Sequence, residues 1–333
     1  MEPTQHQLKR VKNSQEWNVE ILPLIQTNRI TGQDLLNLRR ACYADIEQLR
    51  KRPLLVYASR FFDVPPGTPN QIDIPDVDGF TDLINSVKGQ KSVDILLHSP
   101  GGRADATERI VTILRNEFDE VNFLIPHSAY SAATMLALSG NNIILHPSAT
   151  LGPIDPQVSM TTKEGMRFTP AKSILNGFSK AKAIIKKEGP EALPAYIPLI
   201  EKYTLDLFEL CEDSEKLSKE LVSTWLKNYM LSDEKNSVSK TRKIKKAASF
   251  FSDYNTHKIH TRPLSYDKLT GFGLKIEKAD NVLSELMWEA YVLLSGFFSV
   301  SPFVKLYECN NGISWGKQML VNIPIQDPKT KSN

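Results

Sequence analysis

Residues 93–102 read VDILLHSPGG, an apolar run that ends in a Ser-Pro-Gly-Gly turn. Apolar residues at helical spacing follow over 104–117, so we expect a strand at 93–97, a tight turn and then a helix. Gly101 and Gly102 leave backbone N–H groups uncovered, and the helix directs its positive end toward the same turn. Fixed donors of this kind are what an oxyanion hole requires, although an ordinary strand-to-helix turn uses the same residues.

The alternation of strand and helix continues on both sides of this stretch. Apolar runs predict strands at 54–57, 121–125 and 143–145, and small residues predict a helix at 130–139. The strands are continuously apolar rather than alternating, which is typical of strands buried on both faces. The sequence therefore predicts an α/β fold with a largely parallel sheet covered by helices.

Helical segments flank this alternating region. Thr31 to Asp34 resembles a helix N-cap before apolar residues at helical spacing, and 171–230 is mostly helical in pattern. A last apolar helix is expected at 280–297. We divide the chain into a helical N-terminal extension over 1–52, a catalytic core with a helical end over 53–230, and a C-terminal segment with a basic linker and terminal helix over 231–333.

Composition excludes several classes of protein. The 333 residues are 41% hydrophobic and 24% charged, as in globular proteins, and the three cysteines form no CxxC pair, which favours a reducing compartment. The net charge of +3 does not indicate a nucleic-acid binder, and the basic run at 240–246 lacks aromatics for base stacking, so a solvated linker or helix face is expected. No apolar run could span a membrane and the start of the chain lacks a signal-peptide core, so we expect a cytoplasmic protein.

Two clusters suggest metal sites, but neither has the necessary pattern. Asp73, Asp76 and Asp78 do not fit a calcium loop, because its twelfth position would be an asparagine. They are interpreted as turn and helix-cap carboxylates. His257 and His260 are three residues apart, yet no third ligand and no HExxH pattern accompany them. We therefore predict no metal and no cofactor.

A second strand-to-helix turn carries a serine. Residues 127–134 read HSAYSAAT, directly after the strand expected at 121–125. Small neighbours let the backbone turn sharply at Ser131 and leave Oγ accessible, as in a nucleophile elbow. The letters are not G-x-S-x-G, and a small-residue helix start packed on the sheet is the alternative. A rigid loop, LGPIDPQ at 151–157, is expected at the same edge.

Together these motifs resemble the Clp-fold serine peptidases, which include the proteolytic subunit of the Clp protease and the signal peptide peptidase A group. The greatest resemblance is to the serine dehydrogenase proteinase family. It is carried, over roughly residues 54–278, by VDILLHSPGGRADATERI, SAYSAATMLAL, LGPIDPQ and THKIHTRPLSYDKLTGFGLKI. The resemblance implies a Clp/crotonase-like fold of repeated β-β-α turns, which usually assembles into rings or trimers.

The resemblance also implies roles for individual residues. Ser131 matches the nucleophile, and Gly101 and Gly102 match the oxyanion loop. The backbone N–H of Ala132 would be the second donor to the oxyanion. No metal or organic cofactor is implied.

The general base is less well defined. In the Clp subunit it is a histidine, but the matching place here holds Asp155 or Pro156. The signal peptide peptidase A group uses a serine–lysine dyad, and Lys172, which opens a helix 41 residues after Ser131, is the candidate lysine. Lys202 is a second choice of lysine. His146 is the fallback base, and it could instead support the site together with Asp155.

These motifs predict a cytoplasmic serine peptidase that acts on peptides or proteins through Ser131 and Lys172. One alternative is an inactive Clp-fold scaffold that binds peptides or partners. Another is a crotonase-like acyl-CoA enzyme, which would use the same oxyanion hole without the serine. We also expect a homo-oligomer, with contacts from the apolar stripes at 31–52 and 280–297.

Overall fold

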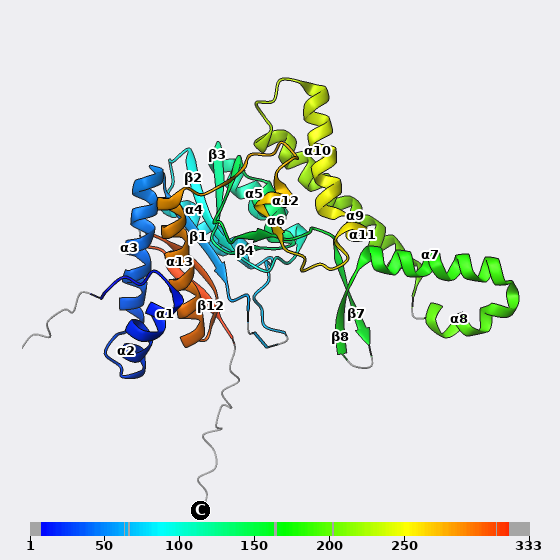
Figure 1. The fold of residues 1–333 in the computed structure, drawn as a ribbon, viewed down its shortest axis with the longest axis horizontal. Coiled ribbons are helices and arrows are strands. Elements are labelled where there is room, and N and C mark those ends of the chain that lie inside the picture. The colour runs from blue at the N-terminus through cyan, green and yellow to red at the C-terminus, as the bar shows by residue number, and fades with distance from the viewer. Residues whose placement is uncertain are drawn as a thin grey trace, which may run out of the picture.

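The computed structural model describes residues 8–62, 64–65, 67–162, 165–201, 203–310 and 312–319. A seven-stranded sheet forms its centre, with strand order β10-β5-β3-β2-β1-β11-β12 (Figure 1). Its strands are β1 (Leu54–Ser59), β2 (Ser92–His98), β3 (Glu120–Ile125), β5 (Asn142–Leu145), β10 (Ile276–Lys278), β11 (Phe303–Cys309) and β12 (Ser314–Gln318). The five strands from β10 to β1 run parallel, and β11 and β12 continue the sheet antiparallel.

Helices cover both faces of this sheet, which confirms the predicted α/β class. On one face lie α4 (Asp76–Ser86), α5 (Ala104–Glu117) and α6 (Ala132–Leu138), and on the other lie α3 (Gly32–Arg50) and α13 (Asn281–Val300). Each face of the sheet packs against its helices in a separate hydrophobic core. In β1, Leu55 and Tyr57 face the first set of helices, and Leu54 and Val56 face the second. This double burial explains why the strands are continuously apolar.

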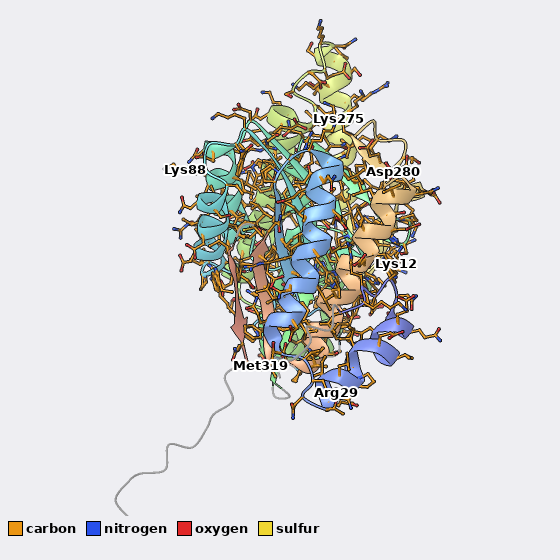
Figure 2. All side chains as sticks on the ribbon, turned by 90° about the vertical axis from the view of Figure 1, so that its left-hand side faces the viewer. Lys12, Arg29, Lys88, Lys275, Asp280 and Met319 are labelled. Atoms are coloured by element: carbon orange, nitrogen blue, oxygen red, sulfur yellow. The ribbon has the colours of Figure 1, made fainter. Side chains whose placement is uncertain are left out.

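The helices α3 and α13 pack side by side, as Figure 2 shows. Thr31 caps α3 as predicted: its hydroxyl accepts from the Asp34 amide at 3.3 Å, and the Asp34 carboxylate accepts from the Thr31 amide at 2.7 Å. Apolar residues of both helices, such as Ile46 and Met287, are buried between them and the sheet. These stripes are therefore core surfaces, and the reason for expecting oligomer contacts through them is removed.

The C-terminal segment contributes more than a linker and a helix. It supplies β10, β11 and β12 to the central sheet, and β11 pairs with β1 in register from Leu55 opposite Cys309 to Ser59 opposite Lys305. The strand β11 was not predicted because Lys305 and Glu308 interrupt its apolar run. Both side chains are buried, and each forms an ion pair with an oppositely charged residue. The three-part division of the chain stays a prediction.

A helical arm extends away from the sheet (Figure 1). It comprises the hairpin β7 (Gln157–Thr162) and β8 (Gly165–Pro170), and the helices α7 (Ala171–Glu188), α8 (Leu193–Ile200), α9 (Leu205–Trp225) and α10 (Ser237–Ser252). The helical pattern of 171–230 is confirmed, with its break at Gly189, where φ is +88°. The hairpin was not predicted. The basic run 240–246 was expected to be either a linker or an exposed helix face. It lies within α10 and is therefore helical.

A small second sheet brings distant segments together beside this arm. Its strands are β4 (Ser128–Ala129), β6 (Thr150–Leu151) and β9 (Leu264–Ser265), with β6 parallel to β4 and antiparallel to β9. The remaining short elements are α1 (Ser14–Glu16), η1 (Trp17–Ile21), α2 (Leu22–Gln26), η2 (Pro190–Ala192), η3 (Leu226–Met230), α11 (Tyr254–His257) and α12 (Tyr266–Leu269). Among the described residues, no helix is both long and apolar enough to cross a membrane.

Candidate active site

Ser131 occupies a strained turn between β4 and α6. Its φ and ψ are +53° and −122°, a backbone region that residues with a side chain seldom adopt. The residue is the N-cap of α6, and α6 is fully buried from Ala132 to Leu138, so the turn cannot relax without moving a core helix. This is the geometry expected of a nucleophile elbow.

The glycine turn after β2 contacts this elbow directly. Gly101 has a φ of +99°, and a Cβ there would lie 2.3 Å from Tyr130 O and 2.7 Å from Ser131 Cβ. A Cβ on Gly102 would lie 2.2 Å from Ile72 O. Neither position can hold a larger residue without displacing backbone, so the glycines permit the turn to approach the serine.

The backbone amides of Gly101 and Gly102 differ in whether they already donate a hydrogen bond. The Gly101 amide donates to Ser99 Oγ at 3.2 Å. Within the part of the chain that the structure describes, the amides of Gly102 and Ala132 have no acceptor. These two amides, rather than that of Gly101, are the available donors for an oxyanion beside Ser131.

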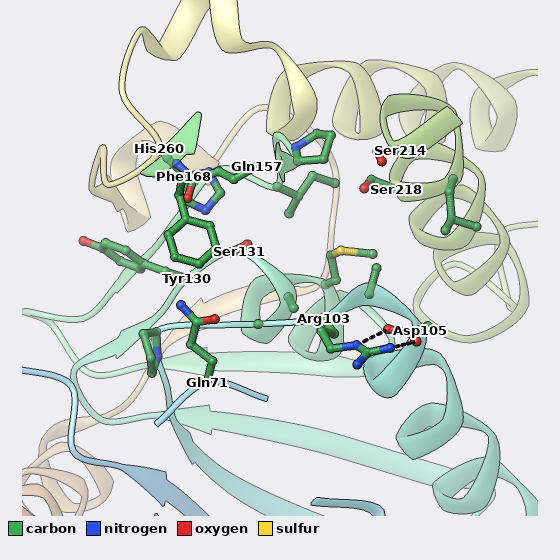
Figure 3. Close-up of a pocket in the computed structure, with 18 of the residues that line it drawn as sticks. Gln71, Arg103, Asp105, Tyr130, Ser131, Gln157, Phe168, Ser214, Ser218 and His260 are labelled. Carbon is green, nitrogen blue, oxygen red and sulfur yellow. Dashed lines mark hydrogen bonds and ion pairs between the residues drawn. The ribbon is translucent and has the colours of Figure 1, made fainter. Parts of the chain in front are cut away.

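A cavity of about 650 Å³ opens over Ser131 (Figure 3). Its walls come from the glycine turn, the serine elbow, the β7–β8 hairpin, α9 and the segment before β9. Its apolar lining includes Met135, Ile154, Phe168, Leu210 and Leu217. At the lower right of Figure 3, away from His260, Arg103 forms an ion pair with Asp105 at 2.6 Å. The size suits a peptide side chain and its flanking backbone.

His260 also lines this cavity, and it is paired with Asp155. His260 Nδ1 lies 3.0 Å from Asp155 Oδ1, and the two side chains are 15% and 1% exposed. With Nδ1 directed to the carboxylate, Nε2 is the free nitrogen of the ring. In Figure 3 the labelled His260 and Ser131 lie on the same side of the cavity, away from Arg103.

No hydrogen bond joins Ser131 Oγ to the His260 ring among the described residues. Catalytic hydrogen bonds of this kind are often long before substrate binds. From the sequence, His260 is a candidate only for metal binding, and Asp155 is only a residue near the place of a missing histidine. The available signal is the segment THKIHTRP, which begins one of the four stretches that carry the family resemblance.

The predicted lysine base is not in this cavity. Lys172 Nζ lies 3.4 Å from Glu215 on α9, its side chain is 36% exposed, and it is not among the residues that line the cavity. The structure therefore does not bring Lys172 together with Ser131 as the dyad requires. Lys202, the second choice, lies outside the described residues.

His146, the fallback base, belongs to an aromatic cluster instead. Its Nδ1 lies 2.7 Å from Ser148 Oγ, and its ring stacks on Trp288 at 5.1 Å. Burial, with a smaller effect of His127, lowers the pKa of His146. His127 stacks on Tyr291 at 4.5 Å. Neither histidine lines the cavity over Ser131.

The acidic cluster at 73–78 has a structural role at its centre. Asp76 is fully buried and its carboxylate accepts from Lys305 and Lys317, each at 2.8 Å. Among the described residues, no group of three or more His, Cys, Asp or Glu is arranged to hold a metal ion.

A comparison with known protein families identifies the class of this protein. The model of a family described as ClpP-like SDH-type serine proteinases matches residues 9–294. The chain belongs to this family. As an SDH-type serine proteinase it carries the Clp-like fold predicted from its motifs.

Relatives of this SDH-type proteinase include two uncharacterized proteins of Methanocaldococcus jannaschii. One is 26% identical over 209 residues, which is 59% of this chain and 68% of the relative. The other is 34% identical over 87 residues, which is 26% of this chain and 30% of the relative. Two solved structures of a membrane-bound stomatin-specific protease are similar, each with a TM-score of 0.36 and 19% identity, covering 65% and 64% of this chain and 79% and 73% of theirs.

Proposed function

We propose that Ser131, His260 and Asp155 form the catalytic triad of this serine peptidase. The supporting observation is the 3.0 Å contact between His260 Nδ1 and Asp155 Oδ1 at the wall of the cavity that holds Ser131. Asp155 is shielded from solvent, so its carboxylate orients the ring and stabilises the imidazolium that forms during catalysis. The same arrangement of roles recurs on unrelated folds, in any chain order.

Each step then uses groups of this chain. His260 Nε2 takes the proton of Ser131 Oγ as the oxygen attacks the peptide carbonyl carbon. The amides of Gly102 and Ala132 hold the oxyanion of the tetrahedral intermediate. The imidazolium passes its proton to the leaving amine as the C–N bond breaks, which leaves an acyl-enzyme. Water, deprotonated by His260, attacks this ester, and Ser131 regains its proton.

A lysine base would require a different side-chain arrangement. A general-base lysine must be neutral and within reach of the serine hydroxyl. Lys172 instead pairs with Glu215 on the arm. An inactive scaffold is less consistent with the site, because a catalytic role of Ser131 accounts for the cost of its strained backbone.

Location and assembly extend the proposal. Cys42, Cys211 and Cys309 are free and buried, which is consistent with a reducing cytoplasm. We propose that the peptidase acts there on peptides or proteins. We also propose a homo-oligomer, since the Clp-fold peptidases that its motifs resemble usually assemble into rings or trimers. Light scattering that gives the mass of a single chain at micromolar concentration would contradict the assembly.

Fluorophosphonate labelling and hydrolysis of an unfolded protein test the triad. Ser131→Ala should abolish both activities, and His260→Gln should reduce both by at least about 100-fold. Lys172→Met is the matched control, which should keep wild-type activity because its amine is committed to Glu215. Loss of activity in Lys172→Met with full activity in His260→Gln would replace this triad by the lysine dyad.

A further inference from the structure

Ile72 lies against the glycine turn as a one-residue strand. Its amide donates to Gly101 O at 2.6 Å, and its carbonyl accepts from the Arg103 amide at 2.9 Å. Gly101 O and the Gly102 N–H belong to the same peptide unit, which is planar and trans, so the two groups point in opposite directions. The bond from Ile72 to Gly101 O therefore holds the Gly102 N–H pointing away from Ile72.

The residues on either side of Ile72 are both tied to one buried ion pair. Before it, Gln71 O accepts a hydrogen bond from Lys305 Nζ. After it, the Asp73 amide donates to Asp76 Oδ2 at 2.9 Å. Lys305 Nζ and Asp76 Oδ2 are 2.8 Å apart, and their side chains are 2% and 0% exposed. The ion pair therefore holds the segment 71–73 by hydrogen bonds at both of its ends.

The ion pair has the partners it needs to stay charged and fixed. Tyr57 OH donates to Asp76 Oδ2 at 3.0 Å, Tyr307 OH donates to Oδ1, and Lys317 Nζ lies 2.8 Å from Oδ1. Burial alone would raise the pKa of Asp76, but Lys305 and these donors outweigh it and lower that pKa. A carboxylate with so many donors is rigid as well as ionised.

We propose that Lys305 and Asp76 are positioning residues for the oxyanion hole. Through Ile72 they fix the orientation of the Gly101–Gly102 peptide, so that the Gly102 amide is directed at the developing oxyanion before substrate arrives. This rests on the proposed function, in which that amide is an oxyanion donor. A misdirected donor loses transition-state stabilisation without loss of substrate binding.

The chain supplies a matched control on the same strand. Glu308 lies three residues after Lys305 on β11, and so on the opposite face of the sheet. It forms an ion pair with Arg39 of α3 at 2.7 Å, and both side chains are as buried as those of the first pair, at 0% and 3%. Tyr43 OH also donates to Glu308 at 2.8 Å. This pair faces α3, on the side away from the glycine turn.

The experiment compares Lys305→Met with Arg39→Met in the full chain, at a temperature where circular dichroism shows both variants folded. Both should lose thermal stability, because each removes a buried cation from a buried carboxylate: among the described residues, Asp76 then keeps only Lys317 as an ion-pair partner and Glu308 keeps none. Only Lys305→Met should slow fluorophosphonate labelling and lower kcat, by at least about tenfold with little change in KM. Hydrogen exchange in peptides that cover residues 99–105 should increase only in Lys305→Met.

A milder variant covers the case in which Lys305→Met does not fold. Lys317→Met removes one partly exposed donor to Asp76 and should lower kcat in the same direction by a smaller factor. Equal effects of Lys305→Met and Arg39→Met on labelling, or wild-type labelling in both the Lys305 and Lys317 variants, would overturn the positioning role. Undiminished labelling of Ser131→Ala would instead overturn the proposed function itself.

Discussion

Asp155 and His260 form their contact four residues beyond the last pair of the β6–β9 ladder. Leu151 pairs with Leu264, Asp155 follows the first by four residues, and His260 precedes the second by four. The pairing brings the two chain segments together, and beyond it the two side chains lie 3.0 Å apart. The proposed base thus reaches Asp155 from a segment more than a hundred residues away along the chain.

The Asp155 carboxylate should matter for rate rather than for folding. Asp155→Asn keeps the size of the side chain but no longer selects the tautomer with a free Nε2, so kcat should fall by about 10²–10⁴ with KM little changed. Steady-state hydrolysis of an unfolded protein measures this. Ser148→Ala, which removes the partner of His146 outside the cavity, is the control and should keep its activity. Wild-type kcat in Asp155→Asn would show that the carboxylate has no catalytic part.

The glycine turn should not tolerate even one added carbon. Gly102→Ala places a Cβ 2.2 Å from Ile72 O, so the turn must shift and its amide must leave the oxyanion position. Labelling by a fluorophosphonate should fall by at least about 100-fold. Gly177→Ala, in α7 with nothing within 4 Å of the new Cβ, should be active and no less stable. Full labelling of Gly102→Ala would contradict the role of this turn.

The identity of the base should appear in the pH dependence of labelling. A histidine base predicts a rate that rises with pH around neutrality and then levels off. A lysine base predicts a rise at a more alkaline pH. The measurement is the labelling rate of the wild-type protein and of Lys172→Met over pH 5 to 10. A profile shared by both proteins in the neutral range supports a histidine base, whereas a plateau reached only in alkaline solution and lost in Lys172→Met would favour the lysine dyad.

Stability should decrease below neutral pH because of His98. Burial, together with the neighbouring His127, lowers the pKa of His98 to about 3, so between about pH 6.5 and 3 the unfolded chain binds a proton there that the folded chain does not. Between pH 7 and 5 this should remove about 2 kcal/mol from the free energy of unfolding. Burial also lowers the pKa of His127, so protonation of this residue in the unfolded chain further decreases the free energy of unfolding at low pH.

Urea denaturation at pH 5, 6, 7 and 8 measures this loss. His98→Asn keeps a donor for Ser128 O, which His98 Nδ1 contacts at 3.1 Å, but cannot be protonated. Its stability should therefore depend less on pH between 7 and 5, while the two proteins should have the same slope between pH 7 and 8. An equally steep loss in both proteins would assign the dependence to other groups.

Much of the fold and half of the site could be predicted from the sequence because the signals are local. The strands at 54–57, 93–97 and 121–125 are apolar runs that must be buried on both faces, and the helix at 104–117 has its own periodicity. Ser131 and the glycines each follow a strand. Parallel strands end at one edge of their sheet, so the two turns had to meet there.

The base, the hairpin and the last strands needed the tertiary structure. His260 contacts Asp155 four residues beyond the pairing of β6 with β9, and these two-residue strands are too short to have a pattern of their own. Lys305 and Glu308 interrupt the apolar pattern of β11. Their burial is stabilised by ion pairs with Asp76 and Arg39, residues far away in sequence.

The sequence by itself determined the parallel sheet, the serine elbow and the glycine turn, since burial and backbone conformation at these places depend on neighbouring residues. Only the tertiary structure decided that His260, and not Lys172, lines the cavity that holds Ser131. A proton acceptor must lie within a few ångströms in space, and the contact between His260 and Asp155 joins segments 105 residues apart, which no local pattern of the sequence records.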